Sequence, residues 1–241
     1  MKPMVWAVLL VGLLEVSGWA QCPLSQNITP QPVSVPLELL RSETTGRYES
    51  FAGEVNNLII RQQTALAGTG QMLDETLWVQ GNRYRLERAD AAGRTLTYLY
   101  DGENRWIITP GGQRAKTSAL ETPQPYLDWS RWIAPTFEVM GLGEYRGRSA
   151  FMLNNQQVDA GQFTEVWVDA ERLIPLVVRQ DTALDRVVTV FTDHRLLEGT
   201  RFGYVPWTRE LYANGELLET TLVQGVQFNV PIEPALFEVE P

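Results

Sequence analysis

Short runs in which apolar and polar residues alternate recur along most of the chain. They are rich in β-branched and aromatic residues, and compact turn sequences such as Gly81-Asn82, Asp101-Gly102 and Asn214-Gly215 separate them. This pattern predicts an antiparallel meander of about ten or more strands, and a sheet of that width tends to curl into a barrel or half-barrel. The predicted strands are residues 54–63, 72–80, 83–89, 95–100, 105–110, 137–145, 149–155, 163–169, 173–181, 186–197, 202–212 and 217–229.

The hairpin at residues 98–112 is apolar on both of its faces. On the return strand Trp106 and Ile108 share one face, yet Ile107 between them is also apolar. A strand that is apolar on both sides needs cover on both sides. We therefore expect Trp106 and Ile108 to line a concave cavity, and Ile107 and Leu99 to pack outside it. Burial of both faces in the core of a β-sandwich is the alternative.

Two segments interrupt the strand pattern with signals of helix formation. A short helix is expected from Pro36 through Leu40, with Ser34 as its N-cap. Residues 120–135 open with two prolines, end at a third and place aromatic side chains on one helical face. This second helix either plugs one end of a barrel core or forms a lid over a ligand cavity, and the pattern favours neither. The residues of its apolar face are Tyr126, Trp129, Trp132 and Ile133.

The first twenty residues have the pattern of a signal peptide. Lys2 precedes an apolar run at residues 5–14 that is too short to span a membrane. Small residues at Gly18 and Ala20 predict cleavage near Ala20. We therefore expect an exported, periplasmic protein with signal peptide 1–20.

The remaining chain divides into an extended leader at residues 21–35, rich in proline and polar residues, and one domain at residues 36–241. Cys22 is the only cysteine, so no disulfide stabilises the fold. Its place just after the predicted cleavage site allows an alternative, in which Cys22 is acylated and anchors the protein to a membrane. Gln21 in front of it fits such a lipoprotein signal poorly, and the unanchored protein is favoured.

Few residues are arranged for catalysis or metal binding. His194 is the only histidine, so neither a metal cluster nor a catalytic triad is expected, and no phosphate-binding glycine loop is present. Residues 101–104 lack the further ligands of a calcium loop and are better explained as a hairpin turn. The formal net charge of -9 argues against a nucleic-acid partner. We expect no cofactor and no metal, and a hydrolase with an unrecognised carboxylate pair is the least favoured function.

The order of several motifs resembles the LolA-type periplasmic carriers of outer-membrane lipoproteins and their wider lipoprotein-sorting superfamily. The resemblance covers about residues 36 to 241. The residues that carry it are Leu77-Trp78-Val79, then Asp101-Gly102, Trp106 and Pro110 in the order D-G-x-x-x-W-x-x-x-P, and Phe237 near the C-terminus.

The resemblance implies a mainly β fold of the α+β kind, in which a single curled antiparallel sheet forms an open half-barrel and short helices lie across its mouth. It further implies a hydrophobic cavity for an acyl chain and no catalysed reaction. In the carriers an arginine three residues after the strand tryptophan grips the lid, but Gly81 occupies that position here. A lid latch of the family type is therefore not expected, and a more distant relative with different cargo is favoured.

These observations predict a non-catalytic, monomeric carrier or binder of the acyl chain of a lipid or lipoprotein, with a membrane-bound donor or acceptor protein as a further partner. An envelope sensor or interaction module on the same half-barrel, lipidated at Cys22, is the alternative. For every expected cavity residue, ordinary core packing is the competing interpretation. The expected cavity residues are Trp78, Tyr98, Tyr100, Trp106, Ile108 and Trp167, with the face of the 120–135 helix as the lid.

Overall fold

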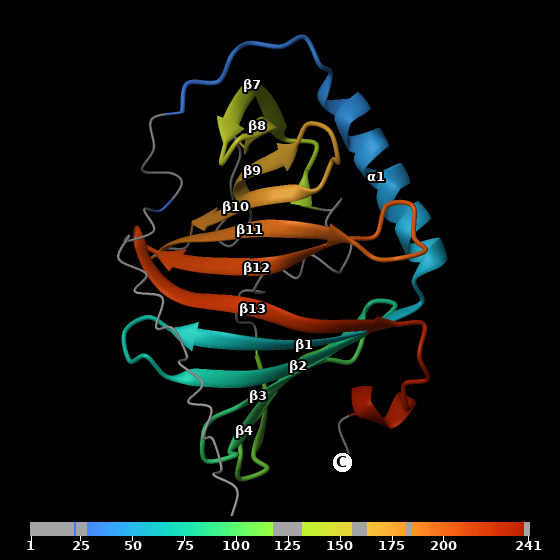
Figure 1. Cartoon of the computed structure of the whole chain (residues 1–241), viewed down its shortest axis with the longest axis vertical. Coiled ribbons are helices and arrows are strands. Elements are labelled where there is room, and N and C mark those ends of the chain that lie inside the picture. The colour runs from blue at the N-terminus through green and yellow to red at the C-terminus, as the bar shows by residue number, and fades with distance from the viewer. Residues whose placement is uncertain (1–21, 23–27, 118–131, 156–162, 182–184, 239–241) are drawn as a thin grey trace, which may run out of the picture.

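The computed structural model describes residue 22 and residues 28–117, 132–155, 163–181 and 185–238 (Figure 1). Within these ranges, thirteen antiparallel strands form one sheet with the order β6-β5-β4-β3-β2-β1-β13-β12-β11-β10-β9-β8-β7. The elements are α1 (Leu37–Glu54), β1 (Asn57–Leu66), β2 (Met72–Gln80), β3 (Arg83–Ala89), β4 (Thr95–Tyr100), β5 (Arg105–Ile108), β6 (Arg114–Lys116), β7 (Phe137–Tyr145), β8 (Arg148–Asn155), β9 (Phe163–Asp169), β10 (Pro175–Asp181), β11 (Arg186–Leu196), β12 (Tyr204–Ala213), β13 (Glu216–Phe228) and the 3-10 helix η3 (Pro234–Phe237).

The sheet remains open. β13 returns to pair with β1, so the first and last parts of the chain meet in the middle of the sheet. β6 and β7 form its two edges and do not pair with each other. The expected open, curled antiparallel sheet is thus confirmed. The prediction missed β6, whose three residues are all exposed and carry no apolar alternation.

α1 defines two faces of this sheet. Its residue Phe51 packs against an apolar cluster that includes Leu58 and Ile60 of β1 and their neighbours on β2, and we call the side of the sheet that carries this cluster the helix face. The opposite side is called the outer face. Side chains alternate between the two faces along each strand, so the registers of the strand pairs assign every residue to one of them.

α1 is longer than the short helix expected from the sequence, and its start differs. Pro36 is the N-cap, and no side chain caps the helix, so the expected cap at Ser34 was wrong. Proline suits this position because its fixed φ leads into a helix and the first N–H groups need no intrahelical partner. The segment was underestimated because it lacks apolar periodicity: only Leu40 and Thr44 are fully buried.

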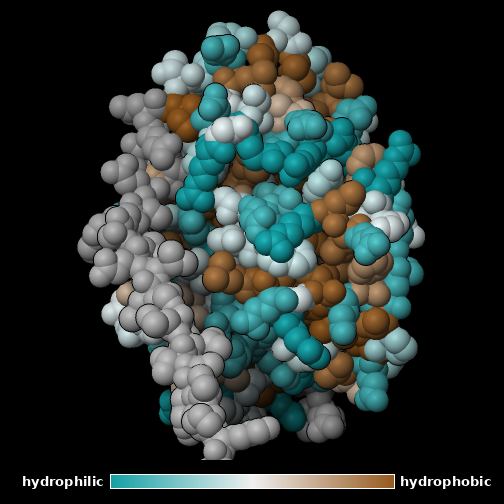
Figure 2. All heavy atoms as spheres, viewed as in Figure 1, coloured by the Kyte–Doolittle hydropathy of each residue, from teal (hydrophilic) through white to brown (hydrophobic). Residues whose placement is uncertain are grey.

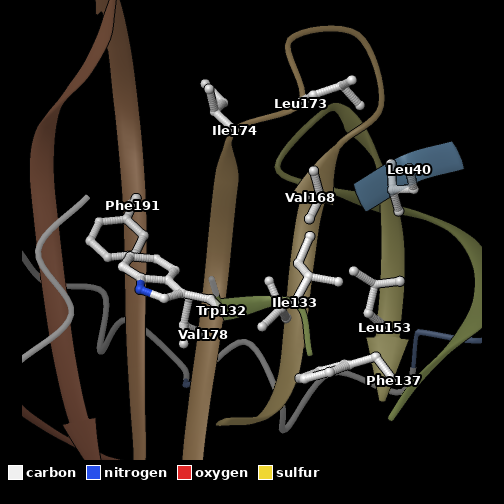
Figure 3. Packing of buried hydrophobic residues seen from close by; sticks show 11 residues of the cluster. Leu40, Trp132, Ile133, Phe137, Leu153, Val168, Leu173, Ile174, Val178 and Phe191 are labelled. Atoms are coloured by element: carbon white, nitrogen blue, oxygen red, sulfur yellow. The ribbon is translucent and has the colours of Figure 1, made fainter. Parts of the chain in front are cut away.

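The second half of the sheet is covered on both faces. On the helix face, Leu40 of α1 and Trp132 pack against β8–β11, with the indole ring stacked on Phe191 at 6.0 Å between centroids (Figure 3). On the outer face, Cys22 and Ile28 of the leader pack against β7–β12. The leader is fixed to the edge strand by backbone hydrogen bonds between Gln31 and Leu142, at 2.7 and 2.8 Å. β9 and β10, in the middle of this half, are therefore buried along most of their length.

Candidate functional site

A groove opens between α1 and the first two strands of the sheet. Its volume is about 170 Å³. α1 and Val55 directly after it form one wall. The start of β1, the end of β2 and Gly81 in the β2–β3 turn form the other wall. We call this opening the helix groove. Its lining residues are Tyr48, Phe51, Ala52, Val55, Asn56, Asn57, Leu58, Val79 and Gly81.

Next to the helix groove, a cluster of buried apolar side chains covers the helix face over β3, β2, β1, β13 and β12. Leu58 and Val79 belong both to the groove and to this buried apolar cluster, so the groove borders it directly. We call this cluster the apolar wall. Its buried residues are Val55, Leu58, Ile60, Leu77, Val79, Tyr84, Leu86, Leu197, Val205 and Val223, and Phe51, Tyr98, Tyr100, Trp207, Val226 and Phe228 pack against them.

Further along the same strands, the helix face changes from apolar to charged. Arg88 on β3 donates from Nε to Glu75 on β2 at 2.6 Å and from both Nη atoms to Glu219 on β13 at 3.1 and 2.8 Å. Gln62 on β1 donates to the second oxygen of Glu75 at 2.6 Å. Arg209 on β12 lies 3.8 Å from Glu219. These five residues form what we call the buried ion cluster, which spans five neighbouring strands.

Arg88 is the centre of this cluster. The Glu75 side chain is fully buried, and the side chains of Arg88 and Glu219 are 16% and 15% exposed. Burial alone would lower the pKa of Arg88, but its hydrogen bonds and ion pairs with Glu219 and Glu75 outweigh burial and raise that pKa. The guanidinium group is therefore held in its charged form. The helix face thus offers an apolar region and a charged region side by side.

The structure divides the six expected cavity residues between the two faces. Tyr98 and Tyr100 pair with Leu86 and Tyr84, so they lie on the helix face and pack against the apolar wall. Trp78, Trp106, Ile108 and Trp167 lie on the outer face, the last of them in the cluster beneath the leader.

The expectation that Leu99 lies on the opposite face from Trp106 was wrong. The two residues are direct partners across the β4–β5 pair, and Ile107 pairs with Tyr98 on the helix face instead. Trp106 is held on the outer face by its own surroundings: its indole Nε1 donates to Asp101 at 3.0 Å, and the Lys116 ammonium lies 5.1 Å from its ring centroid.

The C-terminal segment covers the outer face of the first half of the sheet. Arg85, which pairs with Trp78 across β2 and β3, donates to the backbone carbonyl of Leu236 at 3.2 Å. The Arg83 guanidinium lies 4.9 Å from the ring centroid of Phe237, which is 1% exposed. η3 thus covers part of the outer face beside β3, while Tyr98 and Tyr100 of the hairpin pack against the apolar wall on the helix face.

The residues expected on the lid are described only in part. Tyr126 and Trp129 lie outside the described residues. Trp132 and Ile133 are 9% and 1% exposed and belong to the core cluster under α1. The carbonyl of Ile133 accepts a hydrogen bond from Arg41 Nε of α1 at 2.9 Å. These two residues fill the space between α1 and the sheet, as a plug does.

The structure also places three other residues that the sequence analysis singled out. Gly81 lines the helix groove with a positive φ of 57°, in the tight turn between β2 and β3. Cys22 is 5% exposed and packs in the cluster on the outer face. His194 lies at the end of β11, away from the helix groove. In the described ranges, no three His, Cys, Asp or Glu side chains are grouped to hold a metal ion, and no helix is both long and apolar enough to span a membrane.

Comparison with solved structures identifies the fold. A domain named for outer membrane lipoprotein sorting, from Vibrio parahaemolyticus, superposes with a TM-score of 0.60 at 13% identity, over 83% of this chain and 95% of that one. A DUF1329 family protein from Desulfovibrio piger superposes with a TM-score of 0.61 at 12% identity, over 85% and 98%. No family model matches the sequence, and no curated protein matches it. The expected LolA-like fold is therefore confirmed, as a likeness of fold.

Proposed function

We propose that the protein is a non-catalytic binder of acyl chains that works in the cell envelope, in lipoprotein sorting or lipid transport. The chain of a lipid or lipoprotein would lie between α1 and the apolar wall. The observation that carries this proposal is the helix groove, which borders the buried residues of the apolar wall through Leu58 and Val79. The likeness of fold to a domain named for lipoprotein sorting supports the same function.

Burial of methylene groups supplies the affinity in this mechanism. Each methylene moved from water onto the apolar wall contributes about 0.8 kcal/mol, so five contribute about 4 kcal/mol without any polar contact. The helix groove, at about 170 Å³, is smaller than a typical ligand pocket of roughly 300–1,000 Å³. A full acyl chain therefore requires α1 to move away from the sheet.

The way α1 is attached supports such a movement. Only Leu40 and Thr44 of the helix are fully buried. Its other attachments include polar bonds, among them Arg47 to the carbonyl of Glu171 at 3.0 Å and the Arg201 N–H to Glu54 at 2.8 Å. Water can replace exposed bonds of this kind at little cost in free energy. α1 is thus less firmly held than the strands, and it serves as the lid of the binding site.

An unanchored, periplasmic protein with its signal peptide removed near Ala20 agrees best with the position of Cys22. An acylated cysteine must extend its lipid into a membrane, whereas this side chain is 5% exposed among Tyr145, Trp167 and Tyr212. Acylation would displace the leader from the outer face. The membrane-anchored form would therefore lose the packing contacts of Cys22 on the outer face, which the unanchored form keeps.

A carrier also needs a surface for its donor or acceptor. Figure 2 shows hydrophobic side chains in a band across the middle of the molecule, between hydrophilic groups above and below it. β13 crosses the same part of the view in Figure 1, and its residues Leu218 and Leu222 are 43% and 51% exposed. Exposed apolar side chains of this kind suit contact with a partner protein or a membrane surface.

A bulky side chain in the helix groove tests the proposed function. Ala52 is exposed and lines the groove, so Ala52→Trp fills it without disturbing the core. Glu49→Trp places the same side chain one turn away on α1, outside the groove, and is the matched control. Binding of a fluorescent fatty acid is expected to weaken at least about tenfold in Ala52→Trp only.

The lipid content of the protein purified from the native envelope provides the second measurement. Fatty acid or phospholipid released on denaturation is expected from the wild type and from Glu49→Trp, and much less from Ala52→Trp. Equal binding by all three proteins would show that acyl chains do not use the helix groove. No binding by the wild type would refute the proposed function itself.

A further inference from the structure

A second cavity, separate from the helix groove, lies where the β7–β8 turn, the β9–β10 turn and the end of β11 meet. Its volume is about 300 Å³, and it shares no residue with the helix groove. We call it the arginine pocket because three guanidinium groups line it in a chain whose net charge is -9. Its lining residues are Tyr145, Arg146, Arg148, Arg172, Leu176, Phe191, Thr192, Asp193 and His194.

Two of the three arginines are held in place by carboxylates. Arg146 donates to Glu210 with both Nη atoms, at 3.3 and 2.9 Å. Arg148 donates from Nε to Asp169, and its Nη atoms make no hydrogen bond within the described residues. These contacts fix where the guanidinium groups lie and leave donors of Arg148 for a ligand.

Arg172 differs because none of the described carboxylates lies within ion-pair distance of it. Its Nη1 donates to the backbone carbonyl of His194 at 3.4 Å, and its guanidinium lies 4.9 Å from the ring centroid of Tyr204. Both contacts hold the side chain at the pocket without neutralising its charge. Among the described residues, Arg172 is therefore the pocket arginine without a carboxylate partner, because Asp193, which also lines the pocket, pairs with Arg195. An anionic ligand would supply that partner.

Two polar atoms of the pocket residues lack a hydrogen-bond partner. Tyr145 Oη and His194 Nε2 are both buried, and neither forms a hydrogen bond with the described part of the chain. Buried polar groups are nearly always bonded, so each unbonded one calls for an explanation. Both side chains line the arginine pocket, so a ligand bound there is the candidate partner of both atoms.

His194 specifies the chemistry of that ligand. Burial, together with the positive charges of Arg148 and Arg172, lowers the pKa of His194 to about 4, so the ring is neutral at pH 7. The ring also forms a hydrogen bond with the backbone of Pro175, which involves Nδ1 because Nε2 is unbonded. In the neutral ring Nδ1 then carries the proton, and Nε2 presents a lone pair that can only accept.

A group that satisfies this pocket must carry negative oxygens for the arginines and Tyr145, and one O–H for His194 Nε2. We propose that the arginine pocket binds a protonated phosphate group, either free hydrogenphosphate or the monoester headgroup of a lipid. Sulfate has no proton at neutral pH and cannot donate to Nε2. A phosphodiester lacks the O–H for the same reason.

The surroundings leave room for the rest of a phosphomonoester. Arg148 also lines a neighbouring hollow of about 460 Å³, together with Ser149 and Glu171. A substituent on the phosphate can extend into this hollow while the phosphate stays among the arginines. We therefore expect the pocket to select for a phosphate group that carries an O–H, and to select only weakly for the molecule to which the phosphate is attached.

The sole histidine makes the site directly observable. In mature protein prepared without a histidine tag, the imidazole signals of His194 are the only ones in a ¹H–¹³C NMR spectrum. Sodium phosphate added at pH 7 and constant ionic strength is expected to shift them with saturation, and sodium sulfate is expected to leave them unchanged. Equal shifts with both salts, or no saturable shift with phosphate, would overturn the proposal.

Variants tie that shift to the pocket. Tyr145→Phe removes the unbonded hydroxyl and keeps the ring, and Arg172→Gln removes the pocket arginine without a carboxylate partner. Each is expected to weaken phosphate binding about tenfold, with circular dichroism unchanged. Arg94→Gln, in an exposed pair with Asp90 on the β3–β4 turn, is the matched control and should bind as the wild type does. Wild-type affinity in both pocket variants would refute the assignment.

A second titration distinguishes free phosphate from a lipid headgroup as the ligand. Short-chain phosphatidic acid, glycerol phosphate and inorganic phosphate are compared, with short-chain phosphatidylglycerol as the diester. Tighter binding of phosphatidic acid than of glycerol phosphate identifies a lipid headgroup, and equal binding of both monoesters and inorganic phosphate identifies free phosphate. Binding of the diester as tight as that of phosphatidic acid would contradict the role assigned to His194.

Discussion

Replacing Arg88 by methionine removes the centre of the buried ion cluster. The change deletes three hydrogen bonds and leaves the fully buried Glu75 carboxylate without a cation. Removal of one partner from a buried ion pair typically costs about 3–5 kcal/mol, because the remaining charge stays desolvated. We expect Arg88→Met to lower the free energy of unfolding by that amount, which is a large part of the roughly 5–15 kcal/mol of an ordinary domain.

The cost should come from the unpaired charge and not from lost packing, because methionine keeps most of the apolar volume of the arginine stem. Glu75→Gln in the Arg88→Met background removes that charge and keeps an acceptor for Gln62, which donates to Glu75 at 2.6 Å. The double variant should therefore be more stable than Arg88→Met alone, with a coupling energy between the two sites of about 1–3 kcal/mol.

Urea unfolding followed by far-ultraviolet circular dichroism measures these free energies. Arg94→Gln is the matched control, since it breaks an ion pair with Asp90 in which the arginine side chain is 72% exposed. Solvent screens such a pair, so this variant should be indistinguishable from the wild type. A loss below about 1 kcal/mol in Arg88→Met would contradict the reasoning, because an exposed pair costs that little.

Three further predictions concern the leader, the hairpin and the cysteine. A Cβ on Gly141, whose φ is 143°, would lie 2.3 Å from the Gln31 carbonyl oxygen, so Gly141→Ala should cost more than about 1 kcal/mol of unfolding free energy and expose the leader to limited proteolysis. Gly143→Ala should be tolerated better, since its tightest contact is the flexible Met152 side chain. Partial burial opposes ionisation of Asp101, but hydrogen bonds from the Asn104 N–H, the Trp106 indole and the Glu103 N–H hold its pKa below the usual value. The carboxylate thus stabilises the fold above the unfolded-state pKa of about 4, and the gap in thermal midpoint between wild type and Asp101→Ala should close as the pH falls below it. Cys22, 5% exposed, should react with a thiol reagent only at the rate at which the leader detaches or the protein unfolds, so rapid labelling of the native protein would contradict its placement.

The strand pattern was predictable because it depends on local chemistry. Alternation of apolar residues and compact turns located twelve of the thirteen described strands, and β6 was missed because Arg114–Lys116 has no apolar residue beyond Ala115 to signal a buried face. α1 was underestimated for a related reason. Its sequence carries Thr44, Thr45 and Gly46 in place of an apolar stripe, and contacts with the sheet stabilise it more than its own propensity does.

The sequence did not reveal that the expected cavity residues lie on two different faces of the sheet, because large aromatic side chains were taken to mark one cavity. Tyr98 and Tyr100 do face the apolar wall. The hairpin loop at residues 101–104 has four residues, and this loop length pairs Leu99 with Trp106 across the two strands. Directly paired residues share a face, so Trp106 lies on the opposite face from Tyr98. No short sequence motif announces the buried ion cluster or the arginine pocket, since their residues come from strands and turns far apart in the chain.

The sequence by itself determined where the strands run, where they turn and which side chains share a face within each strand. These follow from the two-residue period of a strand and the conformational preferences of turn residues. Only the tertiary structure decided which face is the inside. That choice depends on where α1, the leader and η3 lie against the sheet, and each of these contacts joins residues distant in sequence, such as Arg85 with Leu236 and Gln31 with Leu142. Apolar alternation shows that a face must be covered, but the segment that covers it is selected by the packing of the whole chain.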